Sequence, residues 1–141
     1  MTRIIFRVLA AVALGISAYV HLHLAHRYAY PGTIRGDQLF YVQGVVAAIV
    51  AAALLATGNK WVWLAAAAVG VASFAAVMLY RYVDVGALGP LPNMNDPTWN
   101  PSPDKLLSAI AEACVPVLWV LNVGAARLSR PHVRGLQPAG S

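Results

Sequence analysis

The stretch LFYVQGVVAAIVAAALLATGNKWVWLAAAAVGVASFAAVMLYRY, residues 39–82, decides the fold of this chain. It consists of two long apolar segments that are separated only by Gly58, Asn59 and Lys60. A helix needs about 20 apolar residues to cross a bilayer, and hydrocarbon offers the backbone no hydrogen-bond partners outside the segment itself. The stretch therefore predicts two membrane-spanning helices, and so short a connection makes them antiparallel neighbours.

Two further apolar segments flank this pair, so that the predicted spans are residues 4–25, 39–57, 61–82 and 106–126. The chain of 141 residues is 60% hydrophobic and 11% charged, whereas about a quarter of the residues in a soluble domain are charged. We predict an all-α fold in which residues 1–128 form a polytopic membrane four-helix bundle. The basic, apolar start also resembles a secretory signal peptide, but its apolar run continues past Leu22 and Leu24 without a clear cleavage site, so we expect a retained span.

The distribution of charge predicts the orientation. The formal net charge is +5, but the basic residues stand singly at the ends of apolar runs, which argues against the basic stripe of a nucleic-acid-binding protein. With the amino terminus inside, the inner flanks hold Arg3, Arg7, Lys60, Arg127, Arg130 and Arg134, and the outer flanks hold Arg27, Arg35, Arg81 and Lys105. Positive residues favour the cytoplasmic side. We therefore predict a multi-pass protein of the plasma (inner) membrane with both termini cytoplasmic.

The connection between the third and fourth spans is rich in proline. Five prolines and two glycines lie between residues 83 and 104, and this density excludes regular structure. We expect an extracytoplasmic loop across the mouth of the bundle, with Trp99 as a plug or interfacial anchor and Ser102 as the N-cap of the last helix. The prolines and glycines of residues 129–141 predict that this segment is a disordered cytoplasmic tail,.

Small residues recur every four positions in the two central spans. The second span carries Gly44, Ala48, Ala52 and Ala56, and the third carries Ala68, Ala72 and Ala76. Stripes of this kind let helix backbones approach closely in a membrane. They predict a tight contact between the second and third spans.

Four polar residues fall at a similar depth in the predicted outer half of the membrane, namely His21, Gln43, Arg81 and Glu112. Glu112 is the most informative, because an ionisable group inside a membrane is costly and needs a partner. Pro116, four residues later, also leaves the Glu112 carbonyl without its helical N–H donor. We predict that the four side chains form one polar pocket, in which Glu112 is either a proton, ion or ligand site or a structural partner of Arg81 or His21.

The run from His21 to His26 also suggests a metal site. His23 and His26 share one helix face, and they would need further ligands from Glu112 or the loop acids,. The alternative is that both histidines simply meet water at the headgroups. We predict no other cofactor: bis-histidine haem needs a histidine on a second span, and His132 is in the tail.

Three short segments carry a resemblance: Ala18-Tyr19-Val20-His21-Leu22, Leu39-Phe40-Tyr41-Val42-Gln43 and Ala109-Ile110-Ala111-Glu112-Ala113. In these the chain resembles a group of uncharacterised four-helix membrane proteins of high-GC bacteria, over most of its length. Its layout is also similar to that of DoxX-type membrane proteins, a resemblance that implies redox or sulfur-related roles.

Three functions follow as hypotheses. The first is a non-enzymatic accessory or binding subunit with a polar pocket in the outer leaflet, whose partners are lipid, another membrane protein or a second copy. The second is a proton-coupled small transporter that acts as a homo-oligomer through Glu112. The third is an outer-surface redox protein that handles quinone or metal. We do not expect this protein to be an enzyme, because the candidate nucleophiles Cys114 and Ser108 have no general base beside them in the sequence,.

Overall fold

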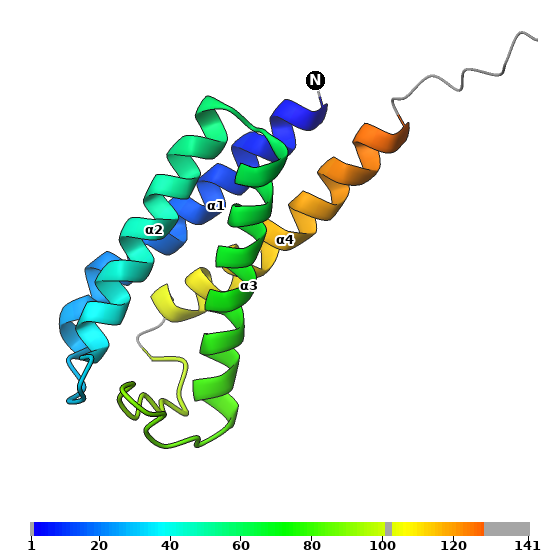
Figure 1. The fold of residues 1–141 in the computed structure, drawn as a ribbon. Coiled ribbons are helices and arrows are strands. Elements are labelled where there is room, and N and C mark those ends of the chain that lie inside the picture. Colours follow the sequence, from blue (N-terminus) through cyan, green and yellow to red (C-terminus); the bar gives the residue numbers. More distant parts are fainter. Residues whose placement is uncertain (1, 101–102, 129–141) are drawn as a thin grey trace, which may run out of the picture.

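The computed structural model describes residues 2–100 and 103–128, and this part of the chain is helical without any strand. Helix α1 (Thr2–Leu24) continues into the 3-10 turn η1 (Ala25–Tyr28) and is followed by α2 (Gly36–Ala56), α3 (Lys60–Tyr82) and α4 (Asp104–Leu128) (Figure 1). All four α-helices are long and apolar enough to cross a membrane. The predicted all-α class with four spanning helices is confirmed to that extent. Ser102 and the predicted tail 129–141 lie outside the described residues.

The short α2–α3 connection is built by two residues. Gly58 has φ +57°, a left-handed conformation that glycine adopts without a steric penalty. Asn59 then caps α3, because its side-chain Oδ1 accepts the backbone N–H groups of Trp61 at 2.9 Å and Val62 at 3.0 Å. These N–H groups would otherwise have no partner at a helix start. The chain therefore reverses direction within three residues, as the sequence predicts.

The bundle is organised by α1, which packs along both α2 and α4, while α3 packs mainly on α4. Its core contains Leu14, Leu54, Trp63 and Val115, each almost fully buried. Helices α2 and α3 touch near their short connection and diverge toward the other end (Figure 1). Large apolar side chains such as Val12, Ile49 and Val71 are exposed on the outside, as expected of a surface that faces lipid.

The small-residue stripes do not mediate the α2–α3 contact, so that prediction is wrong. Gly44 instead faces α1, where an added Cβ would lie 2.6 Å from Leu22 Cγ. Its stripe partners Ala48, Ala52 and Ala56 are exposed, as are Ala68, Ala72 and Ala76 on α3. The physical reason is that a short connection fixes the direction of two helices but not the angle between them. The other small residues that each helix does bury lie on other faces, namely Ala47 and Ala51 on α2 and Ala66, Ala67 and Gly70 on α3.

Helices α3 and α4 approach one another closely at the proline of α4. An added Cβ at Gly70 would lie 2.8 Å from the Glu112 carbonyl oxygen and 3.2 Å from Pro116 Cδ. Pro116 cannot donate a hydrogen bond to that carbonyl, so the space beside it is filled by the backbone of α3 instead. This close approach fixes the depth of Gly70 relative to Glu112.

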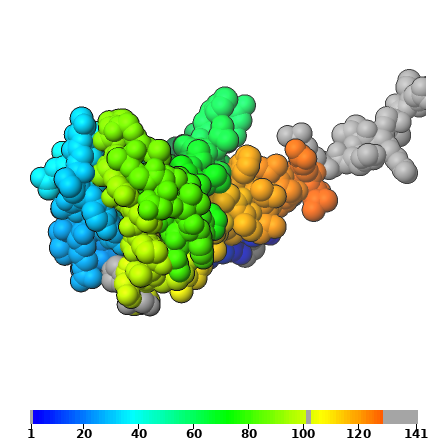
Figure 2. Space-filling model, turned by 90° about the horizontal axis from the view of Figure 1, so that it is seen from below, coloured from blue at the N-terminus to red at the C-terminus, as the bar shows by residue number. Residues whose placement is uncertain are grey.

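The two longer connections lie together at one end of the molecule, which we call the long-loop end. Residues 83–100 cross this end of the bundle (Figures 1 and 2). The Ile34 N–H donates to the Pro90 carbonyl at 3.0 Å, and the Asp96 N–H donates to the Tyr80 carbonyl at 3.0 Å. The loop is thus fastened both to the α1–α2 connection and to the end of α3.

Candidate functional site: a cavity at the long-loop end

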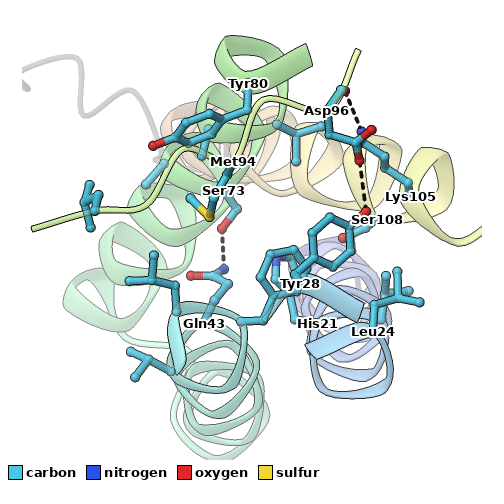
Figure 3. Close-up of a pocket in the computed structure, with 18 residues that line it drawn as sticks. His21, Leu24, Tyr28, Gln43, Ser73, Tyr80, Met94, Asp96, Lys105 and Ser108 are labelled. Atoms are coloured by element: carbon cyan, nitrogen blue, oxygen red, sulfur yellow. Dashed lines mark hydrogen bonds and ion pairs between the residues drawn. The ribbon is translucent and has the colours of Figure 1, made fainter. Parts of the chain in front are cut away.

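A cavity of about 380 Å³ lies beneath the loop, between the four helices (Figure 3). Its walls are mostly aliphatic and aromatic. The lining residues are Val20, His21, Leu24, Tyr28, Leu39, Phe40, Val42, Gln43, Ala72, Ser73, Ala76, Val77, Tyr80, Leu91, Met94, Asp96, Lys105 and Ser108. Of the four residues predicted to share a pocket, His21 and Gln43 line this cavity. Glu112 lies directly behind it, in contact with the lining residues His21 and Ser108.

Glu112 is only 1% exposed and takes all its polar contacts through one carboxyl oxygen. Oε1 accepts the hydroxyl of Ser17 at 2.8 Å and that of Ser108 at 2.9 Å. His21 Nδ1 lies 3.7 Å from the same oxygen. The second oxygen, Oε2, is buried and has no hydrogen-bond partner among the described residues. Helices α1 and α4 are therefore joined through a buried polar cluster in which one acceptor remains unused.

The orientation of the His21 ring follows from its hydrogen bond to the backbone. Nδ1 lies 2.9 Å from the Ser17 carbonyl oxygen, which can only accept, so Nδ1 carries a proton. The Ser17 hydroxyl oxygen lies 3.4 Å from the same nitrogen. Since Nδ1 faces Ser17 and Glu112, the opposite ring edge, which carries Nε2, lies on the side of the cavity.

Gln43 and Ser73 connect the two helices that diverge. The Gln43 side-chain amide donates to the Ser73 hydroxyl across the cavity, as Figure 3 shows. Both residues lie inside predicted spans, where a hydrogen bond between side chains is a common way to hold two helices together. This bond therefore links α2 to α3 at the level of the cavity.

Arg81 lies apart from the cavity and from Glu112. Its guanidinium carbon is 4.9 Å from the Tyr82 ring centroid and 5.5 Å from that of Trp99. No carboxylate of the described residues lies within ion-pair distance of it, and its Nε is buried without a hydrogen-bond partner. Trp99 does not line the cavity either; Leu91 and Met94 are the loop residues that reach it with Asp96.

Three aromatic rings form one wall of the cavity. Tyr28 and Phe40 stack with ring centroids 4.3 Å apart and planes at 11°, and Phe40 lies 5.1 Å from the His21 ring. Stacked and tilted ring pairs of this kind are favourable. The α1–α2 side of the cavity is therefore lined by a mainly apolar cluster of aromatic rings, in which the His21 and Phe40 planes are tilted by 41°.

The rim of the cavity carries an ion pair. Lys105 Nζ lies 2.7 Å from Asp96 Oδ2, and Tyr28 donates its hydroxyl to the same oxygen at 3.1 Å (Figure 3). Burial alone would raise the pKa of Asp96, but the hydrogen bond and charge of Lys105, with hydrogen bonds from Thr98 and Tyr28, lower it below the usual range. Burial and the charge of Asp96 raise the pKa of nearby Tyr30. Asp96 is thus held as an anion that fastens the loop to α4 and η1.

The exposed lining residues of the cavity belong to α2 and α3. Among its lining residues only Val42, Ala72 and Ala76 are exposed, and all three lie on these two helices. The lining residues from α1 and η1 are buried, as is Ser108 of α4. Ala76 and Ala72 precede the end of α3 at Tyr82 by about 9 and 15 Å, at about 1.5 Å of rise per residue. The exposed lining residues therefore lie within the apolar spans, where α2 and α3 diverge.

Sequence reasoning missed the three serines that complete the site. Ser17 lies four residues before His21 and Ser108 four residues before Glu112, a spacing that places the side chains of each pair on one helix face. Ser73 faces Gln43 from α3. The first two could have been found from the i, i+4 spacing of polar residues within apolar spans, whereas Ser73 has no such sequence signal.

The two histidines considered as metal ligands lie outside the cavity. His23 and His26 are both exposed, with ring centroids 6.4 Å apart, and the His23 ring stacks on Tyr19 at 5.5 Å. In residues 2–100 and 103–128, no group of three or more His, Cys, Asp or Glu side chains is arranged to hold a metal ion. The structure thus gives these histidines no third protein ligand in the part of the chain that it describes.

Comparisons of the chain with protein-family models, with curated proteins and with solved structures give no match.

Proposed function

We propose that this chain is a non-enzymatic binding or accessory protein of the membrane, and that its cavity holds a lipid-soluble small molecule. The observation that carries the proposal is that the exposed lining residues, Val42, Ala72 and Ala76, lie within the spans α2 and α3, and we place the opening of the cavity there, facing the lipid. A cavity of about 380 Å³ falls within the range of small-molecule sites, about 300 to 1,000 Å³. Because its opening lies within the spans, a ligand dissolved in the lipid can reach it without crossing water.

The chemistry of the walls supports the same proposal. Such sites combine mostly apolar surface with a few convergent polar groups that fix the ligand's orientation. Here the aromatic wall of Tyr28, Phe40 and His21 is combined with the polar groups of Gln43, Ser73 and Ser108. Asp96 and Lys105 close the rim and neutralise one another. A neutral molecule with a largely apolar body fits this arrangement better than an ion.

We further propose that the long-loop end is extracytoplasmic and that both termini are cytoplasmic, in the plasma (inner) membrane. The cavity then lies in the outer leaflet. The bias of basic residues toward the other end supports this orientation,. Lipid is then the immediate partner, and an accessory role would add another membrane protein or a second copy.

The test is to fill the cavity from α3. Ala76→Phe places a ring at the opening, whereas the control Ala75→Phe adds the same ring at the neighbouring exposed position, which does not line the cavity. Both variants and the wild type are purified in mild detergent, extracted with organic solvent and analysed by mass spectrometry. We expect a small molecule enriched in wild type and Ala75→Phe and depleted in Ala76→Phe. Equal extracts from all three proteins would contradict the proposal.

A second candidate, a proton-coupled transporter that acts as a homo-oligomer, rests on the unused Glu112 Oε2. Membrane-embedded carboxyl groups are common proton-carrying sites. Glu112→Gln keeps an oxygen that accepts from Ser17 and Ser108 but cannot exchange a proton. If the variant folds, still binds the ligand and no longer couples ligand flux to a pH gradient in vesicles, this candidate is supported. Unchanged coupling in Glu112→Gln would exclude it.

A further inference from the structure

We infer that the ligand of the cavity carries a hydroxyl group on a flat, apolar ring, and that this hydroxyl binds His21 Nε2. The inference rests on the proposed function, since it names the chemical class of the ligand for the same cavity. It is carried by one atom, Nε2, and by the ring surface beside it.

Nε2 is the polar atom that the fold leaves available. Nδ1 is occupied by the Ser17 carbonyl and faces Glu112, whereas no donor or acceptor within residues 2–100 and 103–128 contacts Nε2. Nor is Nε2 among the sealed polar atoms without partners, which are Arg7 Nε, Arg81 Nε and Glu112 Oε2. It is therefore both unpaired and open to the cavity that His21 lines.

The chemistry of an imidazole selects a hydroxyl as its partner. With Nδ1 protonated, Nε2 is an acceptor in the neutral ring and a donor in the charged ring. A hydroxyl group can donate its O–H to the first form and accept with its oxygen from the second, whereas an ether or carbonyl oxygen can only accept. A ligand with a hydroxyl therefore satisfies Nε2 whichever state the neighbouring Glu112 favours.

The aromatic character of the wall favours a ring. Phe40 lies against both the His21 and Tyr28 rings, with its plane tilted by 41° from that of His21, so a ligand ring that reaches Nε2 meets aromatic side chains on that side of the cavity. Contacts between the ligand ring and these side chains add favourable stacking to the free energy gained by burying the ligand's apolar area. Ala72 and Ala76, at the opening, leave room for the remainder of an apolar body.

The experiment compares two probes of nearly the same shape, 1-naphthol and 1-methoxynaphthalene. Both have the same ring system, but only 1-naphthol can donate a hydrogen bond. Binding is measured by equilibrium dialysis against full-length protein in lipid nanodiscs, with empty nanodiscs as the blank. We expect 1-naphthol to bind about tenfold more tightly after the blank is subtracted, which corresponds to about one good hydrogen bond.

Two variants locate the binding. His21→Phe keeps a ring against Phe40 but removes Nε2, and His23→Phe makes the same change at an exposed histidine outside the cavity. We expect the preference for 1-naphthol to vanish in His21→Phe and to persist in His23→Phe. If His21→Phe does not fold, nitrogen-15 NMR of histidine-labelled wild type replaces it. Added 1-naphthol should then shift the Nε2 resonance of His21 and leave His23 unchanged.

The outcomes separate this inference from the proposed function. Equal affinities for the two probes, with both lost in Ala76→Phe, would overturn the hydroxyl inference and keep the cavity as a binding site. A naphthol preference that survives His21→Phe, or an Nε2 resonance that does not move, would also overturn it. Binding of both probes that is unaffected by Ala76→Phe would contradict the proposed function itself.

Discussion

At the scale of single residues, the site depends on atoms that would be costly to leave unpaired in a membrane. Glu112 is 1% exposed, and within residues 2–100 and 103–128 only the hydroxyls of Ser17 and Ser108 donate hydrogen bonds to it. A buried carboxyl that loses its donors is strongly destabilising. The two serines, which look unremarkable in the sequence, are therefore the residues that allow an acidic side chain to sit in an apolar span.

Ser17→Ala and Ser108→Ala test this directly. Each removes one of two donors to the same oxygen, so we expect each to lower the free energy of unfolding by about 1 kcal/mol. The double variant should lose more than the sum, because Oε1 then has no hydroxyl donor at all. Unfolding in mixed micelles, followed by circular dichroism, measures all three. Strict additivity would show that the serines do not act through a shared acceptor.

Gly70 gives a second prediction at this scale. An added Cβ would meet the Glu112 carbonyl at 2.8 Å and Pro116 Cδ at 3.2 Å, neither of which can move without shifting α4. We expect Gly70→Ala to destabilise the bundle by about 1 to 3 kcal/mol despite the better helix propensity of alanine.

The control for Gly70 is Gly15→Ala on α1, where an added Cβ has no neighbouring atom within 4 Å. Alanine should there be neutral or stabilising by about 0.5 to 1 kcal/mol. The same unfolding measurement serves both variants. A Gly70→Ala protein as stable as Gly15→Ala would mean that α3 and α4 do not approach so closely.

At the scale of elements, an ion pair and hydrogen bonds hold the loop of residues 83–100 in place. Asp96 carries the ion pair with Lys105 and accepts the Tyr28 hydroxyl, while Lys105 also donates to the Thr98 carbonyl at 2.6 Å. These contacts tie the loop to α4 and to η1 at once. The loop's order should therefore depend on the ionisation of Asp96.

The predicted pH dependence follows from the lowered pKa of Asp96. A carboxyl with a lowered pKa in the folded state contributes stability that is complete above its unfolded pKa and is lost as the pH falls through the folded value. We expect cleavage of the loop by pepsin in reconstituted vesicles to rise steeply only below the ordinary pKa of an aspartate, about 3.9. Loop cleavage that is constant across this range would contradict the prediction.

A neutral-pH version of the experiment uses substitutions. Asp96→Asn removes the charge and should make the loop several-fold more sensitive to proteinase K at pH 7. Asp84→Asn is the matched control, because Asp84 lies in the same loop and, in the described part of the chain, its side chain accepts only a turn-type hydrogen bond from the Gly86 N–H at 3.2 Å. The control should be cut at the wild-type rate.

The helices and their contacts show which features of the fold can be predicted from the sequence. Length and hydropathy predict the four helices because a span must satisfy its own backbone, whatever its neighbours are. Depth along each helix brings His21 and Glu112 to one level, and the structure places Nδ1 and Oε1 3.7 Å apart. Depth alone says nothing about which face a residue occupies. For that reason the small-residue stripe Ala48, Ala52 and Ala56 predicts a helix contact that the structure does not have. Nor does the sequence indicate that Arg81 stacks on Trp99.

At the scale of the whole molecule, the prediction concerns orientation. Four spans place both termini on one side, and we propose that this side is the cytoplasm. A fluorescent-protein fusion after Ser141 should fluoresce, and an alkaline phosphatase fusion there should be inactive. Phosphatase inserted after Gly86, within the α3–α4 connection, should be active. The opposite pattern would reverse the orientation and move the cavity to the inner leaflet.

The divergence of α2 and α3 has a consequence for how occupancy must be measured. A site that fills sideways samples a two-dimensional solution, so its occupancy follows the mole fraction of the ligand among the lipids rather than its concentration in the buffer. Doubling the amount of lipid at fixed total ligand should then nearly halve the fraction of protein occupied for a strongly partitioning compound. Affinities obtained with different amounts of detergent or lipid will agree only when they are expressed per lipid molecule.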